Sequence, residues 1–108
     1  MCSFACPYWL KRIDNRYLLQ VKIGAVKKMP RLPSEYFKDN FVITTSGMTH
    51  PGVMRLAHEE LGVDRILFAA DYPYEVVEEA VSFMDTVPMT EVDRKKIYEQ
   101  NATRLLKL

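Results

Sequence analysis

The segment from Arg65 to Glu75 constrains the fold most, because a short apolar run ends there at a carboxylate and a proline. Ile66 to Ala70 are continuously apolar, which is typical of a parallel strand covered on both faces. Pro73 cannot extend a central strand, so the strand must end before it. Asp71 is therefore predicted at the carboxyl end of a buried strand, where barrel enzymes place their chemistry. A carboxylate there must be hydrogen-bonded, ion-paired or bound to a metal, because burying it bare is too costly.

The residues before this segment predict a complete βαβ unit over 41–70. A first strand is expected at 41–45, ended by Ser46-Gly47, and a helix begins next to Pro51 and stops at Gly62. The second strand, 65–70, follows at once. Two strands joined by one helix through short connections must pair in parallel with a right-handed crossover. This order predicts an α/β fold.

Helices are predicted on both sides of this unit. Tyr8, Trp9, Ile13, Tyr17 and Leu18 recur at helical intervals after Pro7, which predicts an aromatic helix over 7–20. Ser34 is expected to cap a short helix that ends near Asn40. After Asp71 the spacing of apolar residues predicts one helix that Pro88 ends and a last one that Thr90 caps. We expect a single partial domain over 1–108, with the carboxyl-terminal helices at 71–108.

Composition excludes several classes of protein. The chain is 48% hydrophobic and 27% charged with a net charge of +1, which is not the electrostatic footprint of a nucleic-acid binder. No apolar run approaches the roughly 18 residues of a membrane span, and a cytoplasmic location is expected. Cys2 and Cys6 do not form the framework of a disulfide-stapled domain, so reduced thiols are expected. Their spacing from His50 and His58 does not match a standard zinc pattern.

Four ordered motifs make the chain resemble the metal-dependent amidohydrolase superfamily, in its aromatic-acid decarboxylase branch. They are Pro7-Tyr8-Trp9-Leu10-Lys11-Arg12-Ile13-Asp14-Asn15-Arg16-Tyr17, then Phe41-Val42-Ile43-Thr44-Thr45-Ser46-Gly47, then 64–75, and finally Asn101-Ala102-Thr103-Arg104-Leu105-Leu106. Such enzymes are (β/α)₈ barrels of roughly 250 residues or more. With 108 residues, the chain resembles the last third of one: two parallel strands with about four to five helices. Open strand edges then favour a homo-oligomer or a complementing chain.

The resemblance implies roles for four residues. Asp71 would be a metal ligand that also moves a proton to or from the ring carbon bearing the leaving carboxylate; the alternative is a helix cap or a partner of an arginine. Arg12 would bind an anionic oxygen of the substrate, and the alternative is an exposed helical arginine. Tyr72 and Tyr74 would line an aromatic pocket, although aromatic residues there are at least as often packing. Asp14 is expected to have a structural role.

The rest of the family's catalytic residues fall outside this chain. A catalytic divalent ion needs about three protein ligands, and the family draws the others from strands upstream of anything present here. Its His-x-Gly-Glu motif aligns with Met1-Cys2-Ser3-Phe4, where none of the four residues matches. The complete enzyme would use zinc, manganese or magnesium and a small aromatic carboxylic acid, whereas the isolated chain is expected to be inactive. Alternatives are a non-catalytic remnant or interaction module that associates through exposed strand edges, and a product of truncation or proteolysis.

Overall fold

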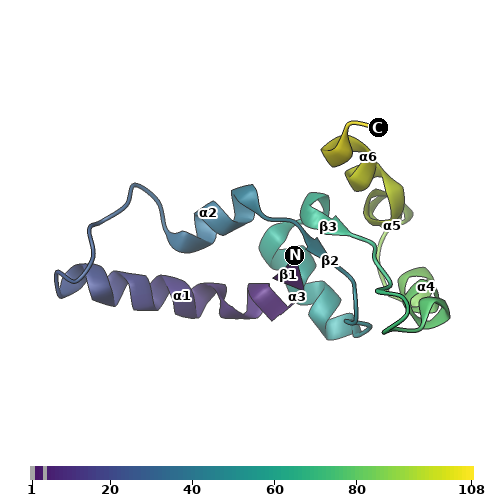
Figure 1. The fold of residues 1–108 in the computed structure, drawn as a ribbon, viewed down its shortest axis with the longest axis horizontal. Helices are drawn as coiled ribbons and strands as arrows, with labels where there is room; N and C mark the ends of the chain where they lie inside the picture. The colour runs from purple at the N-terminus through teal and green to yellow at the C-terminus, as the bar shows by residue number, and fades with distance from the viewer. Residues whose placement is uncertain (1, 4) are drawn as a thin grey trace.

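The computed structural model describes residues 2–3 and 5–108, and its centre is a small parallel sheet between helices (Figure 1). Met1 and Phe4, at the two ends of the segment aligned with the His-x-Gly-Glu motif, lie outside the described residues. In chain order the elements are β1 (Cys2–Ser3), α1 (Ala5–Lys22), α2 (Pro33–Asn40), β2 (Ile43–Thr44), α3 (Pro51–Leu61), the 3₁₀ turn η1 (Val63–Arg65), β3 (Ile66–Leu67), α4 (Val77–Thr86), α5 (Glu91–Lys95), the π-helical segment η2 (Lys96–Gln100) and α6 (Asn101–Leu106). The last three form one continuous helix, 91–106.

The predicted βαβ unit is confirmed. β2 and β3 pair in parallel, with Ile43 opposite Ile66, and α3 connects them. Both isoleucines are fully buried in one cluster with apolar residues of α3, α4 and η2 and of the C-cap of α4, namely Met54, Ala57, Met84, Ile97 and Val87. Because side chains alternate along a strand, these two isoleucines mark the face of the sheet that the helices cover.

Three details differ from the sequence prediction. The paired strands are only two residues each, and a third strand, β1, pairs in parallel with β2 in the order β1-β2-β3. Ser34 does not cap α2: the helix begins at Pro33, and the Ser34 hydroxyl donates to Asp14 Oδ2 at 2.6 Å. Cys6 is disulfide-bonded, so the expectation of a reduced thiol at this position is wrong.

The outer edge of β3 is covered by the carboxyl-terminal helix. The Phe68 N–H donates to the Ile97 carbonyl oxygen at 3.0 Å, and Asn101 Nδ2 donates to the Ile66 carbonyl oxygen at 2.8 Å. Leu67 bonds toward β2, so Ile66 and Phe68 present their groups to the opposite side. The Ile97 carbonyl and the Asn101 side-chain amide thus make the two hydrogen bonds that one residue of a neighbouring strand would make to β3. The expectation of open strand edges is therefore wrong for β3 at Ile66 and Phe68.

The π-helical geometry explains why a helix carbonyl can serve the sheet. The Asn101 N–H donates to the carbonyl oxygen of Lys96, five residues back, rather than to that of Ile97. An α-helix would pair Asn101 with Ile97 instead. The Ile97 carbonyl is therefore available to accept from Phe68, and the irregular turn lies where the helix contacts β3.

An arm formed by α1, α2 and their connection, residues 5–40, extends from the sheet toward the left of Figure 1. The molecule measures 50 × 27 × 27 Å, and its radius of gyration of 15.9 Å exceeds the roughly 13 Å of a compact domain of this length. Asp14 joins the two helices, because its carboxylate accepts from both the N–H (2.9 Å) and the hydroxyl of Ser34. This contact confirms the structural role predicted for Asp14. No helix among the described residues has the length and apolar character needed to cross a membrane.

Candidate active site

The carboxyl ends of β2 and β3 are joined by a side chain rather than by a continued ladder. The Thr45 N–H donates to the Leu67 carbonyl oxygen at 3.0 Å, as parallel pairing requires. One step further, the Thr45 hydroxyl accepts from the Ala69 N–H at 3.0 Å and donates to the Ala69 carbonyl oxygen at 3.1 Å. In a regular parallel pair the Thr45 carbonyl would accept from Ala69. The side chain replaces that bond, which separates the strands just before Asp71.

Asp71 begins the turn that follows. Its φ of 63° lies in the left-handed region, which aspartate adopts more readily than most residues. The Asp71 carbonyl oxygen accepts from the N–H of Tyr74 at 2.9 Å and of Glu75 at 3.1 Å. Main-chain bonds therefore hold the turn and leave the carboxylate exposed.

Neither structural alternative for Asp71 is observed. The N-cap position of α4 is Val76, so Asp71 does not cap that helix. The ion pairs between described residues do not include Asp71. The Asp71 side chain is exposed rather than buried, so the described structure does not require a partner to offset its burial.

Tyr72 and Tyr74 flank Pro73 in the same turn and are 79% and 86% exposed. A cis peptide bond joins Tyr72 to Pro73. Glu75 turns back toward the end of β2, where its Oε1 lies 3.3 Å from the place a Cβ on Gly47 would occupy. Gly47 has a φ of +67°, so this position needs glycine both for its backbone and for the approach of Glu75. The turn therefore brings two carboxylates and two tyrosines to the carboxyl edge of the sheet.

Arg12 lies on the arm, apart from this turn. Its guanidinium carbon is 6.0 Å from the ring centroid of Trp9, one turn earlier on α1. The side chain is exposed and lines an open groove along one face of the helix, with Tyr8, Trp9, Lys11, Asn15, Arg16 and Leu19. The described contacts of Arg12 stay within α1, so the structure brings Asp71, Tyr72 and Tyr74 together but not Arg12.

Both histidines have structural partners. His50 caps α3, since its Nδ1 accepts from the Gly52 N–H at 3.1 Å. His58 Nε2 lies 3.0 Å from Asp93 Oδ2 and links α3 to α5. Over residues 2–3 and 5–108, no three His, Cys, Asp or Glu side chains are grouped so that they could hold a metal ion. The described residues therefore do not fit a complete metal site.

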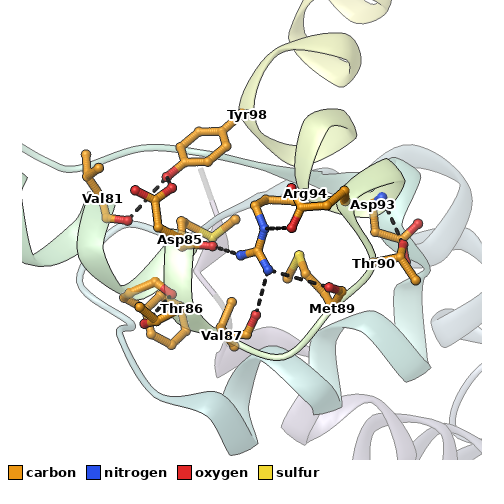
Figure 2. A network of polar contacts seen from close by, with 12 residues as sticks. Val81, Asp85, Thr86, Val87, Met89, Thr90, Asp93, Arg94 and Tyr98 are labelled. Atoms are coloured by element: carbon orange, nitrogen blue, oxygen red, sulfur yellow. Dashed lines mark hydrogen bonds and ion pairs between the residues drawn. The ribbon is translucent and has the colours of Figure 1, made fainter.

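Sequence reasoning missed Arg94, which closes the connection between α4 and α5 (Figure 2). Its guanidinium donates to the carbonyl oxygens of Met84, Val87 (3.1 Å) and Met89 (3.5 Å), and its Nε donates to Glu91. The Arg94 side chain is only 12% exposed. A helix that ends without capping partners leaves carbonyls unpaired, and Arg94 supplies the donors here. In the sequence, Arg94 is only a basic residue after a turn, and the periodicity of apolar residues does not predict its contacts.

Two side chains near the carboxyl-terminal helix have shifted ionisation. Burial, together with a 2.8 Å hydrogen bond to Asp85, raises the pKa of Tyr98 to about 12, which favours the neutral phenol. The hydrogen bond from Lys96 lowers the pKa of Asp64, and the charge of Arg104 acts in the same direction. Asp64 belongs to η1, so these ion pairs fasten the helix 91–106 to the segment that precedes β3.

A parallel sheet with a helix after each strand, and with carboxylates at its carboxyl edge, is the repeating arrangement of the α/β class, to which the (β/α)₈ barrels belong. The comparison with known proteins is more specific: residues 20–108 match the model of the amidohydrolase family, and the chain belongs to that family. The resemblance read from the four motifs is thereby confirmed.

Decarboxylases are among the proteins to which this chain is similar. The chain is 40% identical over 107 residues to the γ-resorcylate decarboxylase of Rhizobium radiobacter, and the match covers 94% of this chain and 31% of that protein. The 5-carboxyvanillate decarboxylase of Sphingomonas paucimobilis superposes with a TM-score of 0.90 at 36% identity, over 96% of this chain and 31% of that one. A dihydroxybenzoic acid decarboxylase from Polaromonas, solved with manganese and 2-nitroresorcinol, gives a TM-score of 0.77 at 37% identity, over 94% and 30% of the two chains. The chain thus spans just under a third of the length of these relatives.

Proposed function

We propose that this chain supplies the carboxyl-terminal third of a metal-dependent, non-oxidative decarboxylase of hydroxybenzoate-type acids, and that it is inactive by itself. The observation that carries the proposal is the place of Asp71. Its exposed carboxylate follows β3 at the carboxyl edge of a parallel sheet, in a chain that is 40% identical to a γ-resorcylate decarboxylase. In barrels, residues at the carboxyl ends of strands perform the chemistry.

Asp71 offers one carboxylate donor, and the described residues provide no group of three metal-binding side chains around it. A divalent ion such as the manganese in the Polaromonas relative would need about two more protein ligands. Those ligands must come from polypeptide beyond the described residues. What Asp71 can do within this chain is hold or release a proton at an exposed carboxylate oxygen beyond the carboxyl end of β3.

The other three predicted residues would bind the substrate. Tyr72 and Tyr74 present exposed rings beside Asp71, where an aromatic acid could stack between them and the missing strands. Arg12 would bind a carboxylate through its guanidinium fork. Because Arg12 lies on the arm, this role requires that the assembled enzyme bring α1 to the carboxyl edge of a sheet.

A second candidate function is that of a non-catalytic interaction module. The observation that favours it is the outward face of α1, which carries large apolar side chains: Tyr8, Trp9, Ile13 and Leu19 are between 45% and 72% exposed. Contiguous apolar surface of this kind usually marks an interaction site. This function would need neither Asp71 nor a metal.

A chimera tests the proposed enzyme. The amino-terminal two thirds of the Rhizobium γ-resorcylate decarboxylase would be joined to this chain in place of its own carboxyl-terminal third. We expect release of carbon dioxide from 2,6-dihydroxybenzoate in the presence of manganese, and loss of at least about 100-fold in kcat for Asp71→Asn. The matched control is Glu59→Gln, an exposed carboxylate on α3, which should retain full activity.

The two functions give opposite results in this assay. A folded chimera in which Asp71→Asn is as active as the Glu59→Gln control would overturn the catalytic role of Asp71. A folded chimera without any activity, whose isolated chain still binds partner protein, would favour the interaction module.

A further inference from the structure

The Thr45 hydroxyl makes both of the hydrogen bonds that main-chain groups of β2 would make to Ala69 in a longer ladder. In regular parallel pairing the Ala69 N–H would donate to the Thr45 carbonyl oxygen, and the Ala69 carbonyl oxygen would accept from the Gly47 N–H. Here the hydroxyl accepts from the Ala69 N–H at 3.0 Å and donates to its carbonyl oxygen at 3.1 Å. Thr45 is 3% exposed, so little water competes for these bonds. One buried side chain therefore holds the segment that leads from β3 to Asp71.

The Thr45 carbonyl is not available for this contact, because it closes the turn after β2. It accepts from the Met48 N–H at 3.1 Å, and Gly47, the third residue of this β-turn, has a φ of +67°. The turn ends β2 and leads the chain toward α3. The hydroxyl thus allows the chain to turn away after β2 while Thr45 stays bonded to Ala69.

The turn that carries Asp71 contacts the end of β2 on both sides. Before the turn, Ala69 is bonded to the Thr45 hydroxyl. Within it, the Asp71 carbonyl oxygen accepts from the Glu75 N–H at 3.1 Å. After it, the Glu75 side chain lies against Gly47, with Oε1 3.3 Å from the place a Cβ would occupy. The left-handed φ of Asp71, 63°, therefore lies between two contacts with the end of β2.

We propose that Thr45 is a positioning residue for Asp71. By holding Ala69 on both its N–H and its carbonyl, the hydroxyl sets the left-handed conformation of Asp71 and so the direction of its carboxylate. Thr45 acts through the main chain of Ala69 and not on a reacting atom. The conformational part of this inference depends on the present chain alone, whereas its consequence for catalysis rests on the proposed function.

Two substitutions separate the hydroxyl from the rest of the Thr45 side chain. Thr45→Val replaces the hydroxyl with a methyl group of similar size and leaves the Ala69 N–H and carbonyl unpaired, unless the turn over 45–48 opens to pair with them. In either case the turn around Asp71 is released. Thr45→Ser keeps the hydroxyl and should keep the conformation. Thr44→Val is the matched control, because it makes the same exchange at a buried position whose side chain points to the other face of the strand.

Nuclear magnetic resonance of the 108-residue chain tests the conformation. A positive φ brings the amide proton and the Hα of one residue close together, so Asp71 should give a strong NOE between them. The Ala69 amide should exchange at least about 10-fold more slowly than that of Ala70, whose N–H is not among the described main-chain donors. Thr45→Val should remove the protection of Ala69 and weaken the Asp71 NOE, whereas Thr45→Ser and Thr44→Val should retain both.

The chimera with the Rhizobium amino-terminal portion tests the consequence for catalysis. A carboxylate that points in the wrong direction slows the chemical step more than it weakens substrate binding. We therefore expect Thr45→Val to lower kcat about 10-fold or more with KM changed less than about threefold, and Thr45→Ser to return kcat to within about threefold of wild type. A loss of stability alone would lower the amount of active enzyme and would not be rescued by serine at equal folded concentration.

Each outcome decides the proposal. Wild-type Ala69 exchanging as fast as Ala70 overturns it, and this measurement needs no variant to fold. Protection and an Asp71 NOE that survive Thr45→Val, or that Thr45→Ser loses, overturn it too. An active chimera in which Thr45→Val has wild-type kcat removes the positioning role in catalysis. A chimera that is inactive with Thr45 in place counts against the proposed function, and the NOE and exchange measurements still decide whether Thr45 positions Asp71.

Discussion

Arg94 is the residue on which the connection between α4 and α5 most depends. Its guanidinium donates to three main-chain carbonyls in a nearly buried position. We expect Arg94→Ala to lower the free energy of unfolding by about 3 kcal/mol, because it leaves buried carbonyls unpaired. Urea unfolding measures the change.

Two variants check the cause of that loss. Arg94→Lys keeps the charge but not the fork of donors, and should restore less than half of the stability. Lys95→Ala, whose side chain is 63% exposed, should change stability by less than about 0.5 kcal/mol. An Arg94→Ala variant as stable as Lys95→Ala would contradict the role assigned to Arg94.

Tyr98 makes stability depend on alkaline pH. Its pKa is raised to about 12 in the folded chain, above the roughly 10 of an unfolded tyrosine. The unfolded state therefore loses its proton first, and the stabilisation present below pH ~10 is lost as the pH rises through the folded pKa. Urea midpoints between pH 9 and 11.5 should fall more steeply for wild type than for Tyr98→Phe. Parallel curves would exclude Tyr98 as the source.

At the scale of elements, the carboxyl-terminal helix acts as a substitute strand for β3. Asn101 is 1% exposed, and its Nδ2 donates to the carbonyl oxygens of Val63 (2.7 Å) and Ile66 (2.8 Å). We expect Asn101→Leu to cost about 2–4 kcal/mol and to speed amide hydrogen exchange at Phe68, whose acceptor lies in the same helix. Gln100→Leu, at the exposed neighbouring position, is the matched control. Unchanged protection at Phe68 in Asn101→Leu would show that the helix contact survives without this side chain.

The helices could be predicted from sequence because their signals are local. Pro51 with Gly62, and Thr90 with the Asp93 amide, mark ends that the structure confirms. The positions of the strands could be predicted, but their lengths could not. The Thr45 hydroxyl replaces a ladder hydrogen bond and so shortens the pairing. The π turn at Lys96–Gln100 could not be predicted, since it depends on Phe68, about thirty residues earlier in the chain, needing an acceptor.

The candidate site was predictable to a similar degree. Asp71, Tyr72 and Tyr74 are neighbours in sequence, so the turn that joins them was visible in the spacing around Pro73. The exposure of Asp71 was not, because it depends on how the other elements pack around the turn. The position of Arg12 relative to Asp71 depends on how far the arm extends, and helical periodicity carries no information on that.

At the scale of the whole molecule, the amount of manganese that a protein retains distinguishes a complete metal site from a partial one. Over the described residues no three metal-binding side chains are grouped, and one or two carboxylates in water hold a divalent ion only weakly. We expect the isolated chain to retain less than about 0.1 equivalent of manganese after equilibrium dialysis, whereas the chimera with the Rhizobium amino-terminal portion retains close to one. Asp71→Asn in the chimera should lower manganese affinity about 10-fold or more, and Glu59→Gln should not. Stoichiometric manganese on the isolated chain would contradict this account, because the ligands that we assign to the missing strands would then have to lie within these 108 residues.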